Sequence, residues 1–216
     1  MSIDVKELTD QADLEQVFRL RYRVYVEEIG ARMKHADHER RIIRDPLDKT
    51  ARVLGAFVIG ELVGSVRLNW ASHDKDNYAE YYNMRAFGKY FPERTTFTNK
   101  LVVAAEFRKS PVAITLAVEG FKIYCRSDAA FDFIDCKGDL KPFFLKLGYR
   151  QVFPDVVGHP ESGATHYPMV LVNADIDHLT KVRSPFRRVI EHLPKDPSSV
   201  EFFKSEILPK SIGVKS

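Results

Sequence analysis

The chain has 216 residues, of which 44% are hydrophobic and 29% are charged, so it is long enough and apolar enough to bury the core of a globular protein. Its formal net charge of +3 does not indicate nucleic-acid binding, and no apolar run approaches the length of a membrane-spanning helix. The two cysteines have no metal-type spacing, which favours a reducing, cytoplasmic location.

A short strand over residues 3–8 is followed by a helix that begins after Asp10 and ends at Gly30. Apolar residues recur at helical spacing in this helix, at Leu14, Val17, Phe18, Tyr25 and Ile29. Arg21 falls on the same face. A guanidinium on an apolar face costs free energy unless it meets an anion. We therefore expect Arg21 to bind either a carboxylate of this chain or a ligand.

The remaining elements alternate between strands and helices. Residues 31–50 are a long polar loop, and 51–59 and 61–70 form a hairpin with its turn around Gly60–Glu61. After a short helix near 77–88, the pattern predicts strands at 95–105, 131–136, 149–153 and 166–172, with helices at 111–127 and 139–147. This order predicts an α/β (α+β) fold in which one mixed central sheet carries helices on both faces.

The chain changes character near residue 184, where prolines begin to interrupt short amphipathic pieces. We therefore expect a main domain over residues 1–183 and a partly helical C-terminal extension over residues 184–216. The extension packs either on the domain or on a partner.

The junction between strand 95–105 and helix 111–127 is the best-defined candidate site. A strand that ends in a tight turn and starts a helix presents N–H groups and a positive dipole end, which suit a phosphate. Arg108 and Lys109 add positive charge there. The alternative is an ordinary crossover with a solvated basic pair.

The element order and this turn resemble the GNAT acyltransferase fold. The GNAT diphosphate loop reads Gln or Arg, two residues, Gly, one residue, and Gly or Ala. RKSPVA at 108–113 matches at both ends but has Pro111 in place of glycine. FFLKLGY at 143–149 resembles a second GNAT stretch, although Phe144 replaces a tyrosine that is a general acid in many acetyltransferases. Both departures point away from a standard acetyl-CoA enzyme.

The resemblance implies a set of donor-binding residues. Backbone N–H groups near residues 102–104 would polarise the acyl carbonyl, and the loop would hold the donor's phosphates. The set is Val102, Val103, Ala104, Arg108, Lys109, Ser110, Val112, Ala113 and Phe144.

The N-terminal half resembles a narrower group, the autoinducer (acyl-homoserine-lactone) synthases and the long-chain N-acyl amino acid synthases. The matching stretches are LRYRVYVEEIG at 20–30, DPLD at 45–48 and GSVRL at 64–68. Carried over, Arg21 and Tyr25 fill the helix positions, Asp45 and Asp48 the acidic pair, and Arg67 the strand position. The resemblance covers residues 10–150.

One departure concerns the amine acceptor. Autoinducer synthases carry Glu-x-x-Arg before the central apolar run, where this chain has Phe97-Thr98-Asn99-Lys100. The acid is lost and the base becomes Lys100. An amino acid or another small amine therefore fits better than the homoserine-lactone reaction.

The implied reaction moves a fatty acyl group from a thioester to an amine, which requires a deprotonated amine, a polarised carbonyl and a stabilised leaving thiolate. Water, Glu106, Asp45 or Asp48 takes the amine proton. The predicted catalytic set is Arg21, Asp45, Asp48, Arg67, Lys100 and Glu106. Two structural interpretations stay open. In the first, a clamp formed by Arg21, Asp45 and Asp48 orders the loop. In the second, Arg67 faces solvent, because it alternates with Val66 and Leu68 along its strand.

A weakened diphosphate loop favours the phosphopantetheine of an acyl carrier protein over acyl-CoA as donor. An acidic carrier protein would dock on basic residues, for which the candidates are Arg40, Arg41, Arg44, Arg108, Lys109, Lys122 and Arg126. His35, His38 and Glu39 lie close together without a third histidine, so we predict no metal. Two alternatives are a conventional acetyl-CoA-dependent N-acetyltransferase and a non-catalytic acyl-binding domain.

Overall fold

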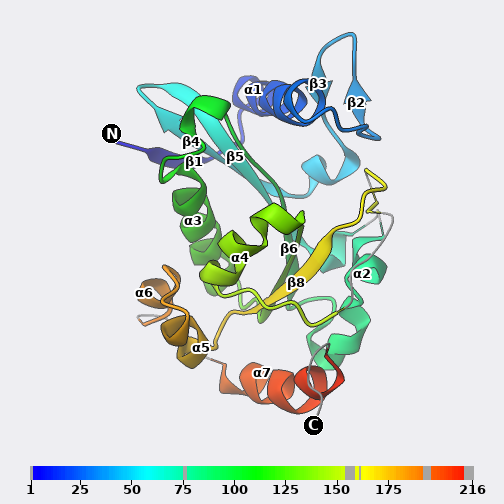
Figure 1. Ribbon diagram of the computed structural model, residues 1–216, viewed down its shortest axis with the longest axis vertical. Coiled ribbons are helices and arrows are strands. Elements are labelled where there is room, and N and C mark those ends of the chain that lie inside the picture. The colour runs from blue at the N-terminus through cyan, green and yellow to red at the C-terminus, as the bar shows by residue number, and fades with distance from the viewer. Residues whose placement is uncertain (1, 75–76, 154–158, 161, 192–195, 212–216) are drawn as a thin grey trace. The chain divides into compact units, whose positions relative to one another are not determined.

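The computed structural model describes residues 2–74, 77–153, 159–160, 162–191 and 196–211. Six strands form one mixed sheet, mostly antiparallel, with helices beside it, as predicted (Figure 1). The strands, in their order across the sheet, are β1 (Asp4–Glu7), β4 (Arg52–Val58), β5 (Glu61–Trp70), β6 (Thr95–Val103), β7 (Phe131–Cys136) and β8 (Tyr167–Val172). No described helix is long and apolar enough to cross a membrane.

The chain divides into two compact units. Unit one comprises residues 1–69 and 98–120, and unit two comprises residues 70–97 and 121–216. Strand β6 begins in unit two and ends in unit one, and helix α3 (Val112–Arg126) begins in unit one and ends in unit two.

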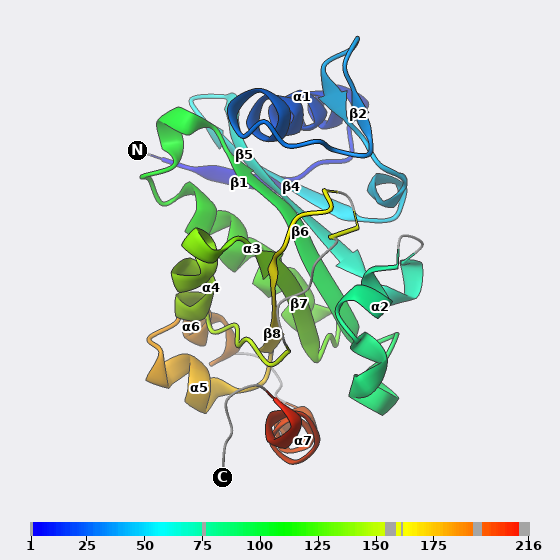
Figure 2. The ribbon, with the colours of Figure 1, turned by 45° about the vertical axis from the view of Figure 1, so that its right-hand side comes forward.

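In unit one, helix α1 (Gln11–Tyr22) lies beside β4 and β5 (Figures 1 and 2). Asp10 caps the helix as predicted, because its carboxylate accepts from the N–H of Ala12 at 2.8 Å. Val17 and Phe18 belong to the same buried apolar cluster as Val53 of β4. The helix continues to residue 28 as a π-helix, Arg23–Glu28, so the predicted extent is right but the last turns are wider than expected.

The hairpin of β4 and β5 contains a β-bulge that decides which residues share a face. Ala56 pairs with Gly64 and Phe57 pairs with Leu62, so Val63 has no opposite residue. A Cβ added to Gly64 would lie 2.9 Å from Val112 of α3 and 3.1 Å from Leu116. The face of β5 that carries Gly64 is therefore packed against α3. The side chains that follow along the strand point alternately to the opposite face and to this one.

Two local predictions are corrected. The predicted polar loop over 31–50 contains the short strands β2 (Ala36–Asp37) and β3 (Ile42–Ile43) and the 3₁₀ helix Pro46–Lys49. Ile42 and Ile43 are buried, and this burial gives the segment a fixed structure. The predicted strand over 149–153 is wrong, because Arg150 alone forms a β-bridge there, to Val170.

In unit two, β7 pairs antiparallel with β8 and parallel with the first three residues of β6. Helix α4 (Lys141–Leu147) ends at Gly148, which has a φ of 113°, as expected for a left-handed C-terminal cap. The other helices of this unit are α2 (Tyr78–Tyr81), α5 (Ile176–Lys181), α6 (Arg187–Ile190) and α7 (Pro197–Phe202).

The C-terminal part of the chain packs on unit two. The ring of Phe202 lies 5.2 Å from that of Tyr90 and 6.2 Å from that of Phe131, centroid to centroid. The hydroxyl of Tyr90 also lies 3.0 Å from the Oγ of Ser198. Residues 192–195 and 212–216 of the expected extension lie outside the described residues. The boundary at residue 184 stays a prediction.

The turn of the β4–β5 hairpin offers a test of the backbone geometry. It comprises Ile59 and Gly60, one residue earlier than predicted, with φ values of 50° and 80°. Two positive φ values define a turn that prefers Asn-Gly, and Ile59 is 98% exposed. Ile59→Asn should therefore raise the free energy of unfolding by about 1 kcal/mol, measured by urea denaturation. Ile59→Thr, which keeps the β-branch, should gain little; an equal gain would show that polarity rather than φ matters.

Candidate active site

Arg21 lies on the buried face of α1, as its spacing predicted. Its side chain is 0% exposed, and Nη1 donates to Oδ1 of Asp48 at 2.8 Å. The guanidinium also lies over the ring of Phe18, 5.5 Å from the centroid. A buried ion pair of this kind is costly to disrupt, because removal of one partner leaves the other charge buried.

The two aspartates are held by the 3₁₀ helix Pro46–Lys49. Asp45 is its N-cap and accepts from the N–H of Leu47 at 3.0 Å, while Asp48 accepts from the N–H of Asp45 at 2.9 Å. Pro46 fits the first helical position because it has no N–H to leave unpaired. The sequence Asp-Pro-Leu-Asp therefore forms a capping box that fixes both carboxylates before any cation binds.

Arg67 completes the charge pairing from β5. Its Nη1 donates to Oδ1 of Asp45 and lies 3.3 Å from Oδ1 of Asp48, and its Nε donates to Asn99 at 2.9 Å. The side chain is 0% exposed, so the solvent-facing interpretation is wrong. The alternation with Val66 and Leu68 holds, but the opposite face of the strand is buried too.

Lys100 joins the same cluster from β6. Its Nζ lies 3.9 Å from Oδ2 of Asp45 and 5.4 Å from the ring centroid of Tyr25. Lys100 has a φ of 54°, a left-handed conformation that few residues adopt inside a strand and that marks functional or strained positions. Five of the six predicted catalytic residues therefore meet in unit one.

Glu106 does not belong to this charged cluster. It lies exposed in the 3₁₀ helix Ala105–Phe107. Asn99 is a member that sequence reasoning did not assign, since its Oδ1 accepts from both Arg67 and Asn69. Its only signal was its position beside Lys100 in the stretch where the autoinducer synthases carry Glu-x-x-Arg.

The charge balance of the cluster changes the acidity of Asp48. Burial alone would raise the pKa of this carboxyl, but the guanidinium groups of Arg21 and Arg67 outweigh that effect and hold the pKa below its ordinary value. Asp48 is therefore ionised at neutral pH and serves as an anchor for cations.

Along one edge of the Arg21 guanidinium, no described residue accepts a hydrogen bond. Nε and Nη2 are buried and have no hydrogen-bond partner among the residues that the structure describes. Arg52 shows what this edge can bind, because its own Nε and Nη2 donate to the two carboxylate oxygens of Glu7. The unused edge of Arg21 thus has the shape that matches a carboxylate.

The predicted donor-binding residues of unit one lie together around the start of α3. Val102, Val103, Ala104 and Val112 are buried, Ser110 and Ala113 are partly buried, and Arg108 and Lys109 are exposed. The N–H of Ala104 donates to the carbonyl of Val63 at 2.9 Å, so it is occupied. Arg108 also donates hydrogen bonds within the chain, to the carboxylate of Glu28 and to the carbonyl of Val103. The phosphate-binding role of this turn stays a prediction.

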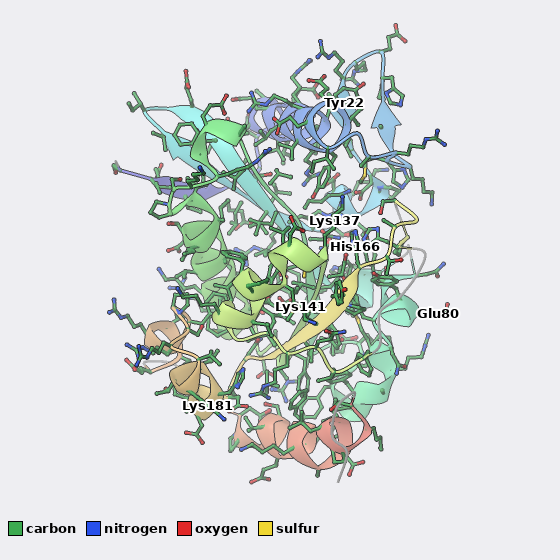
Figure 3. All side chains as sticks on the ribbon, viewed as in Figure 1. Tyr22, Glu80, Lys137, Lys141, His166 and Lys181 are labelled. Carbon is green, nitrogen blue, oxygen red and sulfur yellow. The ribbon has the colours of Figure 1, made fainter. Side chains whose placement is uncertain are left out.

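Of two other residues considered in the sequence, Phe144 belongs to unit two and His38 belongs to unit one. Phe144 is buried in α4 of unit two, with its ring 5.8 Å from that of Tyr149. Tyr22, at the end of α1 (Figure 3), lies 2.9 Å through its hydroxyl from Nδ1 of His38. This contact gives His38 a structural role in the loop.

The comparisons with known proteins agree with this fold. Residues 20–118 match the family model of the acetyltransferase (GNAT) domain. The architecture is GNAT-like, so the first of the resemblances seen in the sequence is confirmed at the level of the fold. No curated protein sequence matches this chain.

Several solved structures are similar. FeeM, an N-acyl amino acid synthase from uncultured soil microbes, is 12% identical with a TM-score of 0.67 over 87% of this chain and 97% of its own. BjaI, a CoA-dependent acyl-homoserine lactone synthase solved with SAM and isopentyl-CoA, is 14% identical with a TM-score of 0.60 over 85% and 91%. ElaA of Escherichia coli is 15% identical with a TM-score of 0.57 over 79% and 99%. At these identities the likeness establishes the fold.

The buried cluster predicts a pH-dependent stability. Asp48→Asn should lower the free energy of unfolding at neutral pH by about 3–5 kcal/mol, because Arg21 and Arg67 lose a buried counter-charge. The folded-state pKa of Asp48 lies below its ordinary value of 3.8, so the carboxylate contributes fully above about pH 4 and progressively less as the pH falls through the folded-state pKa.

Urea denaturation of both proteins between about pH 7 and pH 3 measures this effect. The difference between wild type and Asp48→Asn should shrink in acid. Asp4→Asn, at an exposed position of β1, should show no difference at either end of the range. A difference for Asp48→Asn that stays constant or grows as the pH falls would contradict the electrostatic assignment.

Proposed function

We propose that the protein is an N-acyltransferase that moves a fatty acyl group from a thioester to the amine of an amino acid or a similar small molecule. The GNAT N-acyltransferase architecture supports the class of reaction. The similarity to FeeM, whose name gives it as an N-acyl amino acid synthase, supports the class of acceptor. The buried cluster around Arg21 supports a role for the acceptor's own carboxylate.

The observation that carries this proposal is the unused edge of Arg21. A buried guanidinium with two unpaired N–H groups costs free energy in the protein by itself. A ligand carboxylate removes that cost with two parallel charge-assisted hydrogen bonds. Amino acids bring such a carboxylate two bonds from the reacting amine, which would place the nucleophile close to the cluster.

Among the predicted carboxylates, Asp45 is the best placed to take the amine proton. Its Oδ2 has no hydrogen-bond partner within the described part of the chain, although Nζ of Lys100 lies 3.9 Å away. Asp48 is a weaker base because its pKa is lowered, and Glu106 lies exposed outside the cluster. Asp45, directly or through water, would accept the ammonium proton. The amine nitrogen then bonds to the acyl carbon, the carbon–sulfur bond breaks, and the second proton that the nitrogen loses passes through water to the leaving thiolate.

The donor is proposed to be an acyl carrier protein. Pro111 has no N–H to offer a diphosphate, and Arg108 is engaged by Glu28 within the chain. Both features weaken a coenzyme A site. The phosphopantetheine of a carrier protein reaches the same thioester without a diphosphate of the coenzyme A type, and basic residues such as Lys109 would attract its acidic surface.

The acceptor site can be tested by comparing Arg21 with Arg52. The purified protein is incubated with a panel of amino acids and a long-chain acyl group carried on acyl carrier protein or on coenzyme A. N-acyl amino acids should form and are detected by mass spectrometry. Arg21→Lys should raise KM for the amino acid about 10–100-fold, because lysine cannot supply two parallel donors. Arg52→Lys, which loses the same kind of fork at an exposed pair, should leave KM unchanged.

Amino-acid amides provide the complementary test. They lack the carboxylate, so the wild-type protein should use them poorly and Arg21→Lys should discriminate little between acid and amide. Equal use of acids and amides by the wild type would contradict the proposed role of Arg21. Products limited to acetylated amines would favour a conventional acetyl-CoA enzyme, and no product with any donor would favour a non-catalytic acyl-binding domain. Arg21→Lys keeps a positive charge beside Asp48, so a higher KM in this variant with a normal Tm indicates ligand binding, whereas a collapsed Tm indicates a structural clamp. Arg21→Ala should lower Tm under either interpretation, because it leaves Asp48 without the buried cation beside it.

The choice of donor gives a separate prediction. At equal acyl length, kcat/KM should be at least about tenfold higher with acyl carrier protein than with acyl-CoA. The carrier-protein rate should also fall more steeply with added salt, because charged surfaces steer its association. A preference for acyl-CoA, or rates with the two donors that depend equally on salt, would overturn the carrier-protein assignment while leaving the acceptor assignment intact.

A further inference from the structure

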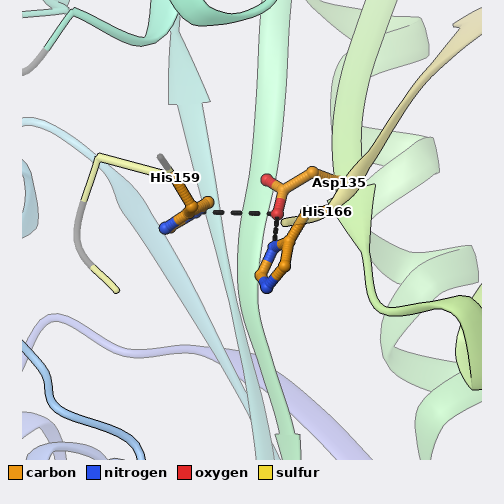
Figure 4. A group of neighbouring side chains, drawn as sticks. All are labelled: Asp135, His159 and His166. Carbon is orange, nitrogen blue, oxygen red and sulfur yellow. Dashed lines mark hydrogen bonds and ion pairs between the residues drawn. The ribbon is translucent and has the colours of Figure 1, made fainter. Parts of the chain in front are cut away.

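Three side chains of the metal-ligand type meet in unit two. Asp135 lies on β7, His166 directly precedes β8, and His159 lies in the segment before it. Each offers one ligand atom, and the three atoms lie within 4.8 Å of one another. Figure 4 shows both imidazole rings facing the same oxygen of the Asp135 carboxylate.

The pairing of β7 with β8 brings two of these residues together. Asp135 is paired with Pro168 and Cys136 with Tyr167, so His166 lies at the end of the ladder at which β7 finishes. All three side chains are mostly buried, with exposed fractions of 5% for Asp135, 10% for His159 and 15% for His166. The cluster is therefore a defined part of the fold and is not a chance meeting of surface groups.

The distances within the cluster are compatible with a shared ion as well as with ion pairing. Nε2 of His159 lies 3.6 Å from Oδ2 of Asp135, which is beyond the length of a hydrogen bond. Two ligands that each lie ~2.1 Å from a tetrahedral ion are separated by ~3.4 Å, close to the observed distance. Nδ1 of His166 forms a hydrogen bond to the same Oδ2, and this closer pair would open to admit an ion.

Surrounding groups already orient two of the three ligands. The hydroxyl of Tyr82 donates to Oδ1 of Asp135, which leaves Oδ2 for the imidazole side. Both the N–H and the Oγ of Ser162 lie 3.4 Å from Nδ1 of His159, which turns Nε2 toward the carboxylate. With an ion on Nε2, Nδ1 would carry the proton and donate to Oγ of Ser162. Outer contacts of this kind fix the ring orientation of histidine ligands in metal sites.

Two buried polar atoms add to the case for an occupant. Nε2 of His166 and the hydroxyl of Tyr81 are buried and have no hydrogen-bond partner among the described residues. The ring of Tyr81 lies 5.5 Å from that of His159, in an edge-on arrangement. Polar atoms are rarely left without partners inside a protein, so this side of unit two is incomplete by itself.

We propose that unit two binds one divalent transition-metal ion of the zinc class through Asp135, His159 and His166. Two imidazoles and one carboxylate suit such an ion, whereas Mg²⁺ and Ca²⁺ prefer oxygen ligands only. Three protein ligands leave a fourth position for water. The site departs from the prediction of no metal, and it does not depend on the proposed acyl transfer.

Metal binding to the full chain, prepared without a polyhistidine tag and stripped with a chelator, tests the proposal. Isothermal titration with Zn²⁺ should show one ion per chain, Co²⁺ should give visible absorption typical of a four- or five-coordinate site, and Mg²⁺ should not compete. Zn²⁺ should also raise Tm. His159→Gln and His166→Gln should each weaken Zn²⁺ binding more than about tenfold.

His73→Gln, at an exposed histidine outside the cluster, is the matched control and should bind Zn²⁺ like the wild type. His159→Gln is the most informative variant because its residue lies outside any helix or strand, and Zn²⁺ should raise its Tm less than that of the wild type. Absence of a one-to-one Zn²⁺ complex in the wild type would overturn the proposal. Wild-type affinity in both His159→Gln and His166→Gln would also overturn it.

Discussion

The buried pair of Arg21 and Asp48 is the interaction on which the arrangement of unit one depends. A guanidinium inside a protein is tolerated only if an anion is fixed beside it, and the capping box of residues 45–48 fixes two. The second aspartate then allows Arg67 to be buried on the adjacent strand. The helix, the 3₁₀ helix and the strand are thus held together by charge as well as by apolar packing, because Oδ1 of Asp48 lies beside both arginines.

The sequence was most informative where one residue type has a single physical solution. Helical spacing placed Arg21 on the apolar face of α1, and Asp-Pro-Leu-Asp contains the residues that a capped turn requires. It was less informative where the backbone departs from regular geometry. The bulge opposite Ala56, the left-handed φ of Lys100 and the π-helical end of α1 all reposition side chains, and none has a signal in residue type. Alternation placed Arg67 opposite Val66 and Leu68, but it could not show that this second face of β5 is buried as well.

The cluster of Asp135, His159 and His166 illustrates a different limit. Local spacing is all that a single sequence offers, and it draws attention to histidines that are close along the chain, such as His35 and His38. In the fold, His38 contacts Tyr22, while the histidines that meet a carboxylate come from a segment that follows β7 by more than twenty residues. Only strand pairing brings them to Asp135, and pairing partners cannot be read from one sequence.

Arg21 and Arg52 together show why the candidate active site is better explained by binding than by stability. Arg52 uses Nε and Nη2 to hold Glu7 at the surface, where such a pair contributes little to the free energy of folding. Arg21 has the same two groups in a buried position, where pairing them would contribute far more, yet they have no partner in the described chain. A fold under selection for stability alone would have filled that edge with a third carboxylate or replaced the arginine by an apolar residue. An edge left open at this cost is explained if a substrate carboxylate fills it.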